Sequence, residues 1–84
     1  MNITFSPQAW DNYLYWAATD KAMLKRINLL IKAIQQDPFS GIGKPEALKH
    51  GLSGYWSRRI NEEHRLVYKC TDDALLIAQL RYHY

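Results

Sequence analysis

Apolar residues recur at helical spacing in the first half of the chain and gather in short strand-like runs in the second half. Ser6 and Pro7 predict a helix start, because serine is a common N-cap and proline fits the first helical position. Asp20 is a second N-cap candidate, and Pro38 disfavours a helical residue before it. The pattern therefore predicts a strand at residues 1–5 and two helices, at about 7–18 and 21–37.

Both predicted helices carry one apolar face, and the turn between them is tight, so we expect an antiparallel pair. Trp10, Tyr13 and Trp16 are at helical spacing, which is more typical of core or partner contacts than of a nucleotide platform. The apolar stripes are Trp10, Tyr13, Leu14 and Ala17 in the first helix, and Met23, Leu24, Ile27, Leu30, Ile31 and Ile34 in the second.

The second half predicts strands at residues 55–60, 64–70 and 75–82, after a loop at 38–45 that is rich in glycine and proline. The turns at 61–63 and 71–73 are so short that they imply an antiparallel meander. The element order is then β-α-α-β-β-β. It predicts one α+β domain over residues 1–84, with an antiparallel twisted sheet, two N-terminal helices packed on one face and the opposite face open.

Composition narrows the function classes. The net charge of +3 favours a polyanionic partner. The single cysteine, Cys70, excludes an intrachain disulfide, which fits a reducing cytosol. The sequence has neither a signal-peptide pattern nor an apolar stretch of the roughly 18 residues that span a bilayer. We therefore expect a cytoplasmic protein without a membrane partner.

Acidic residues are scattered in a way that disfavours a metal site. Of the five acids after the loop, four lie in predicted hairpin turns, and only Glu46 lies elsewhere. Lys44 and Lys49 flank Glu46, and the strands carry further cations. Magnesium prefers clustered carboxylates and zinc requires spaced cysteines and histidines, and the sequence offers neither. We expect chemistry without a metal or other cofactor.

Two arginines are expected to face each other on the sheet. A three-residue turn at 61–63 places Arg59 opposite Arg65, and directly opposed residues share a face. A phosphate could bridge the two guanidinium groups, whose donors match its oxygens. Two solvated arginines explain the same pair, and the pair alone favours that simpler interpretation.

The chain finishes on Arg81, Tyr82, His83 and Tyr84. Aromatic side chains can stack on unpaired RNA bases, and an imidazole can move a proton near neutral pH. A tail packed against the sheet, with His83 on the surface, is an equally good interpretation of this segment alone. His50, His64, Trp56 and Cys70 need no functional role: we expect a solvent-facing His50, a hydrogen bond for His64 and packing roles for the other two.

These groups could cut RNA without a metal. The nucleophile is the 2′-hydroxyl of the RNA itself, so the enzyme must remove its proton, stabilise the phosphorane and protonate the leaving 5′ oxygen. Glu46 could act as base and His83 as acid, each worth about 10²- to 10⁴-fold in rate. Arg65 would stabilise the developing charge. The products would be a 2′,3′-cyclic phosphate, or the 3′-phosphate it opens to, and a 5′-hydroxyl.

The run KPEALKHGLSGYWSRRINEEHRLVYK at 44–69, together with the terminal RYHY and the DNYLYW segment at 11–16, resembles the YoeB toxins of the RelE/ParE superfamily. The resemblance covers nearly the whole chain. It implies a RelE-like fold and a messenger RNA interferase that cuts at the A-site codon of the 70S ribosome. Ala47 and Leu80 depart from the usual family pattern, and neither removes a functional group. The implied catalytic residues are Glu46, Arg65, His83 and Tyr84, and the expected RNA contacts are Lys44, Lys49, Arg58, Arg59, Arg81 and Tyr82.

The resemblance also implies a YefM-type antitoxin encoded in the same operon, and contact with operator DNA only through the antitoxin complex. A basic RNA-binding face could be masked by an acidic peptide that folds on contact. A homodimer is left open. Two alternatives remain, a gyrase-poisoning toxin of the same fold and a non-catalytic RNA-binding module, because fold does not fix function.

Overall fold

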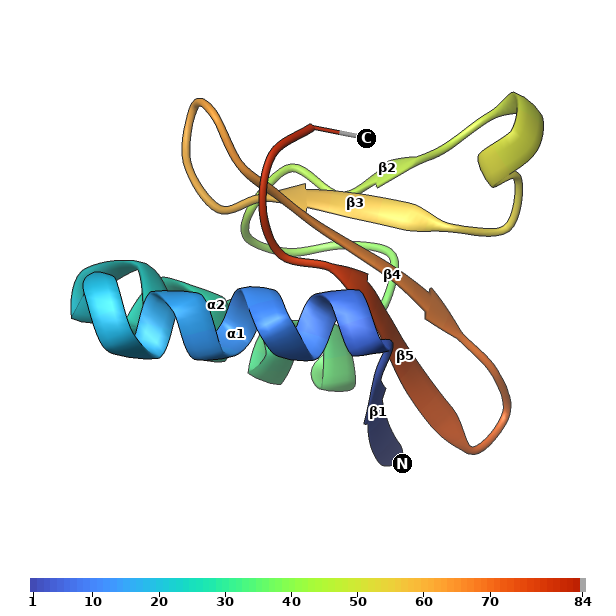
Figure 1. The fold of residues 1–84 in the computed structure, drawn as a ribbon. Coiled ribbons are helices and arrows are strands. Elements are labelled where there is room, and N and C mark those ends of the chain that lie inside the picture. The colour runs from blue at the N-terminus through green and yellow to red at the C-terminus, as the bar shows by residue number, and fades with distance from the viewer. Residues whose placement is uncertain (84) are drawn as a thin grey trace.

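The computed structural model describes residues 1–83. Two helices follow a first short strand, and four further strands with a single-turn 3₁₀ helix make up the rest (Figure 1). The elements are β1 (Asn2–Phe5), α1 (Pro7–Thr19), α2 (Lys21–Gln36), β2 (Glu46–Ala47), η1 (His50–Leu52), β3 (Trp56–Arg59), β4 (Arg65–Cys70) and β5 (Ala74–Gln79).

The strands form one sheet in the order β1-β5-β4-β3-β2. Strands β2 to β5 pair antiparallel, as the short turns predict. β1 instead runs parallel to β5, so the sheet is mixed and the expected wholly antiparallel pairing is wrong for this one strand. The two helices carry the chain away from β1, and no hairpin turn constrains which strand it joins or in which direction. The α+β class and the helix positions are confirmed.

Both helix starts depend on the predicted caps. The Ser6 hydroxyl accepts the Ala9 N–H at 3.0 Å, and the Asp20 carboxylate accepts the Met23 N–H at 3.2 Å. These bonds satisfy backbone donors that have no partner within the helix. α2 ends one residue before Asp37, as Pro38 requires. No helix in residues 1–83 has the length and apolarity to cross a membrane.

The core lies between the helices and one face of the sheet (Figure 1). The predicted stripe of α2 is confirmed, and that of α1 is wrong except for Tyr13, which packs against the core. Trp10 and Leu14 are 46% and 47% exposed, whereas Ala9 and Trp16 are buried. Ala9 faces the core, so Trp10, the next residue along the helix, points outward. The core residues include Ile27, Leu30, Ile31 and Ile34 of α2, and Leu66, Tyr68, Leu75 and Ile77 of the sheet.

The last strand is shorter than predicted. β5 ends at Gln79 and not at Tyr82, after a register irregularity opposite the Val67–Tyr68 step of β4. Beyond it, Leu80 returns to the core and Tyr82 takes a left-handed φ of +65°. The C-terminal segment therefore leaves the sheet and passes beside the turn between β3 and β4 (Figure 1). The sequence pattern also missed β2, which is only two residues long.

Candidate active site

A row of paired residues crosses the sheet on the face opposite the helices. Glu46 of β2 pairs with Ser57 of β3, Ser57 with Val67 of β4, and Val67 with Gln79 of β5. Directly paired residues share a face. Leu66 and Tyr68, which alternate with Val67, point into the core, so this row lies on the face opposite the helices, called the open face below. Ser57 and Val67, in the middle of the row, are themselves buried at 3% exposure. Glu46 is therefore on the open face.

The opposed arginines lie on the same face. Arg59 pairs with Arg65, as the three-residue turn predicts. Arg59 follows Ser57 by two residues, and Arg65 precedes Val67 by two, so alternation keeps all four on one face. The step between the two rows is about 7 Å along the strands. The lone acid and the arginine pair thus share one face of the sheet, with Glu46 on β2 and the arginines on β3 and β4.

Backbone carbonyls fix the Arg65 guanidinium in place. Its Nη1 donates to the carbonyl oxygens of Asn61 at 2.7 Å, His64 at 3.1 Å and Glu62 at 3.3 Å. The Asn61 side chain shapes the same turn, because its Oδ1 accepts the N–H groups of Glu63 and His64 at 2.9 and 2.8 Å. Among residues 1–83, the Arg65 side chain forms hydrogen bonds through Nη1 only. A held guanidinium with its other donors available suits an anion.

The C-terminal segment is bound next to Arg65. The Arg65 N–H donates to the Tyr82 carbonyl at 3.1 Å, and the Tyr82 N–H donates to Nδ1 of His64 at 2.7 Å. The Gln79 amide donates to the carbonyls of Arg81 at 2.7 Å and His83 at 2.9 Å. His83 is exposed and follows directly on this anchored stretch. Tyr84, an expected catalytic residue, lies outside the described residues.

The remaining expected RNA contacts divide into two groups. Lys44, Lys49 and Arg59 are exposed, and Tyr82 is 54% exposed, so all four are open to a ligand. Arg81 is half-buried instead, with its guanidinium carbon 3.7 Å from the centre of the Tyr15 ring of α1 and 4.7 Å from that of Tyr82. Its Nε is buried without a hydrogen-bond partner among residues 1–83. Arg81 thus attaches the tail to α1 in this structure.

The expectation that Arg58 contacts RNA is wrong. Its side chain is 0% exposed. It donates from Nη2 to the Asp37 and Ser40 carbonyls at 2.6 and 3.0 Å, and from Nη1 to the Ile42 carbonyl at 3.1 Å. Its Nε donates to the Tyr68 hydroxyl at 3.2 Å. Arg58 lies on the helix-covered face because it alternates with Arg59, so it holds the loop before β2 and is closed to a ligand.

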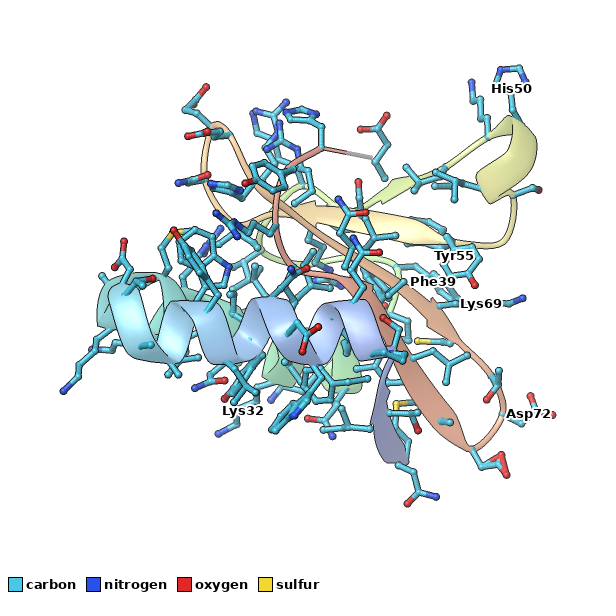
Figure 2. All side chains as sticks on the ribbon, viewed as in Figure 1. Lys32, Phe39, His50, Tyr55, Lys69 and Asp72 are labelled. Carbon is cyan, nitrogen blue, oxygen red and sulfur yellow. The ribbon has the colours of Figure 1, made fainter. Side chains whose placement is uncertain are left out.

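The expectations for His50, His64 and Trp56 are confirmed, with one addition. His50 is exposed at the far end of the sheet from the tail (Figure 2). Trp56 packs against the core, and its ring centre is 4.9 Å from that of Phe39. His64 makes the expected hydrogen bond, but its partner is the tail, which the sequence did not reveal. Gln79 was missed altogether, and its outward position in a strand gave no signal of a backbone partner.

Among residues 1–83, burial or hydrogen bonding shifts the pKa values of Tyr68, Cys70 and Asp37. Desolvation raises the pKa of the Tyr68 hydroxyl, against the opposing effect of the Arg58 hydrogen bond. Desolvation also raises the pKa of the Cys70 thiol, in keeping with a packing role. The hydrogen bond from Ser40 lowers the pKa of Asp37. In residues 1–83 no group of three or more His, Cys, Asp and Glu side chains could hold a metal ion.

Comparison with known proteins gives consistent matches over all or nearly all of the chain. The family model for the YoeB-like toxin of bacterial type II toxin–antitoxin systems matches residues 5–84. The chain is 63% identical to the toxin YoeB of Escherichia coli strain K12 and 61% identical to that of Streptomyces coelicolor, in both cases over 84 residues and 100% of each chain.

Solved structures agree in fold. A YoeB/ParE toxin from Agrobacterium tumefaciens superimposes with a TM-score of 0.98 at 44% identity, covering 100% of both chains. A YoeB dimer from Staphylococcus aureus gives 0.94 at 55% identity, and a YoeB–YefM complex from the same organism gives 0.93 at 54%. Each of these two matches covers 100% of this chain and 98% of the other.

Proposed function

Since the chain belongs to the YoeB-like toxins of bacterial type II toxin–antitoxin systems, we propose that it is an endoribonuclease that cuts messenger RNA in the ribosomal A site. One observation carries the proposal. The open face of the sheet holds Glu46 beside the paired Arg59 and Arg65, and the tail that bears His83 is hydrogen-bonded to the backbone of Arg65. These positions support an acid, a cation and an imidazole acting on one phosphate.

The proposed reaction is an in-line displacement at phosphorus. Glu46 takes the proton of the 2′-hydroxyl, and the 2′ oxygen forms a bond to phosphorus. The bond to the 5′ oxygen breaks, and His83 gives that oxygen a proton. The products are a 2′,3′-cyclic phosphate and a 5′-hydroxyl. DNA lacks the 2′-hydroxyl and is not a substrate for this step.

Arginines would stabilise the charge that develops on the phosphorane. The Arg65 guanidinium is held by three carbonyls before any substrate arrives, so little reorganisation is needed when charge appears. Arg59 lies opposite and adds a second positive charge. With these two cations on the phosphate, the proposed mechanism needs no metal or other cofactor.

The substrate contacts follow from the exposed groups around this surface. Lys44 and Lys49 would bind flanking phosphates, and the exposed ring of Tyr82 would stack on a base. Tyr84 is proposed to act beside His83. We assign to the 70S ribosome the task of bending the message into line. The proposed site of action is therefore the cytoplasm.

A YefM-type antitoxin is the proposed partner. The Staphylococcus aureus relative was solved both as a dimer and in complex with YefM. The exposed cations of this chain would attract an acidic antitoxin segment that covers the proposed active site. Operator DNA would then be bound only through the antitoxin complex, and a homodimer is proposed for the free toxin.

Mapping of RNA ends on ribosomes programmed with a defined message tests the proposal. Wild type should cut within the A-site codon and leave a 5′-hydroxyl, Arg65→Ala should not, and Lys32→Ala should cut like wild type. Lys32 is a matched control because it lies on α2, away from the open face (Figure 2). Intact message with poisoned gyrase would favour the gyrase-inhibiting alternative. Binding without cuts would favour a non-catalytic RNA-binding module.

A further inference from the structure

The buried side chain of His64 accepts a hydrogen bond from the C-terminal tail, at the backbone N–H of Tyr82. The residue is 7% exposed. Its ring meets the Trp16 ring edge-on, with the centres 4.9 Å apart, and the Tyr82 ring at 5.6 Å. Packing on two sides fixes the orientation of the imidazole. Nδ1 accepts the Tyr82 N–H, so the proton of the neutral ring is on Nε2.

Both polar groups of the Tyr82 backbone form hydrogen bonds to two adjacent residues, His64 and Arg65. His64 accepts the N–H at 2.7 Å, and the Arg65 N–H donates to the carbonyl at 3.1 Å. Tyr82 has a φ of +65°, a left-handed conformation that costs energy for a residue with a side chain. The two hydrogen bonds offset this cost. They also set the direction in which the chain continues into His83.

α1 anchors Leu80, two residues before Tyr82. The Trp16 indole N–H donates to the Leu80 carbonyl at 2.9 Å, and the Asn12 side chain accepts the Leu80 N–H at 3.0 Å. With Leu80 fixed by α1, the tail turns two residues later, where the His64 bond acts together with the bonds from Arg65 and Gln79. Removal of the His64 bond should free the turn and leave the fold and Leu80 in place.

We propose that His64 is a positioning residue that aligns the His83 imidazole with the phosphate bound at Arg65. This inference rests on the proposed function, in which His83 is the acid. His64 and Arg65 are adjacent, so one short stretch of chain both holds the tail and presents the guanidinium. A tail displaced by about 1 Å would lower the rate by up to about 10²-fold without loss of substrate binding.

Two matched variants separate the hydrogen bond from the packing of the ring. In His64→Asn the side-chain oxygen takes the place of Nδ1 and can still accept the Tyr82 N–H. His64→Leu has a similar volume and no acceptor. Both lose the ring contact with Trp16, so a difference in cleavage between them reports the hydrogen bond to Tyr82. At saturating ribosome concentration, we expect His64→Asn to cut within a few-fold of wild type and His64→Leu about 10- to 100-fold more slowly, with equal ribosome affinity.

A message with sulfur in place of the 5′ oxygen at the scissile linkage sharpens the test. A thiolate leaves without protonation, so the acid becomes dispensable. On this message His64→Leu and His83→Ala should both approach the wild-type rate, and Arg65→Ala should stay slow. The inference is overturned if His64→Leu cuts the ordinary message as fast as His64→Asn, or if its defect persists with sulfur.

Amide hydrogen exchange at Tyr82 gives a measure that does not depend on cleavage. The amide should be protected in wild type and in His64→Asn, and should exchange faster in His64→Leu. If wild type cuts neither message but shows this pattern, the proposed function fails and the placement of the tail stands. Equal protection in all three proteins overturns the placement. Should His64→Leu not fold, His64→Gln replaces it, since its amide reaches the Nε2 position, and it is expected to show the same defects.

Discussion

Arg58 and Arg59 are neighbours in the chain but differ in burial, in hydrogen-bond partners and in the face of the sheet on which they lie. Arg58 is fully buried, and its guanidinium donates to three backbone carbonyls and a tyrosine hydroxyl. The Arg59 side chain is exposed on the opposite face, across from Arg65. Alternation along β3 alone separates them. Residue type therefore does not determine the role of an arginine in this protein: the face of the sheet does.

The buried arginine also affects the open face. It binds the loop from Asp37 to Ile42, which leads directly into β2 and Glu46. The Arg59 N–H adds a bond to the Gly43 carbonyl at 2.7 Å. Gly43 has a φ of +86°, and an added Cβ there would lie 2.8 Å from Leu30 and 3.0 Å from the Arg58 side chain. These contacts fix the position of the loop, and the loop in turn positions Glu46, which follows it in the chain.

The largest expected effect falls on the open face. Arg65→Ala removes the held guanidinium and should lower the A-site cleavage rate about 10²- to 10³-fold, because a preorganised donor for the phosphorane is lost. Single-turnover cleavage on programmed ribosomes measures this. Arg65→Lys keeps the charge without the planar fork and should recover part of the rate. A cleavage rate in Arg65→Ala equal to that of wild type would remove Arg65 from the mechanism.

Substitution of the buried arginine should lower the stability of the fold. Arg58→Met leaves three loop carbonyls and the Tyr68 hydroxyl without their donor, and should lower the free energy of unfolding by about 2–3 kcal/mol. Arg59→Met is the matched control and should change it by less than about 0.5 kcal/mol, since its side chain is exposed. Urea unfolding followed by tryptophan fluorescence compares the two. Equal losses in both variants would contradict the division between the faces.

The same contrast explains what the sequence could predict. The three-residue turn fixes hairpin register, so the Arg59–Arg65 pair was predictable, and caps at Ser6 and Asp20 located the helices. Arg58 was assigned to RNA because its partners are backbone carbonyls from a loop, which leave no side-chain pattern. The tail contacts of His64 and Gln79 were also hidden, because they depend on the irregularity in β5 and on the turn at Tyr82.

A smaller effect should appear at alkaline pH. Burial raises the pKa of Tyr68 above its usual value of 10.0. The folded state therefore keeps this proton to higher pH than the unfolded state, and the Tyr68 contribution to stability falls as pH rises above about 10. Tyr68→Phe removes the titrating group. Its stability should fall less steeply than that of wild type between pH 9 and 11 in urea titrations, and parallel curves would contradict the assignment.

The last prediction is that the cleavage rate does not depend on a metal ion bound at the open face. A single sulfur in place of a non-bridging phosphate oxygen at the scissile linkage weakens coordination to Mg²⁺, and a thiophilic ion such as Mn²⁺ restores it where a metal stabilises the phosphorane. Arginines bind the phosphate by hydrogen bonds, so added Mn²⁺ should leave the rate on this message unchanged. The ribosome stays in its usual Mg²⁺ buffer throughout. Recovery by Mn²⁺ in wild type would show that a metal shares the role assigned to Arg59 and Arg65.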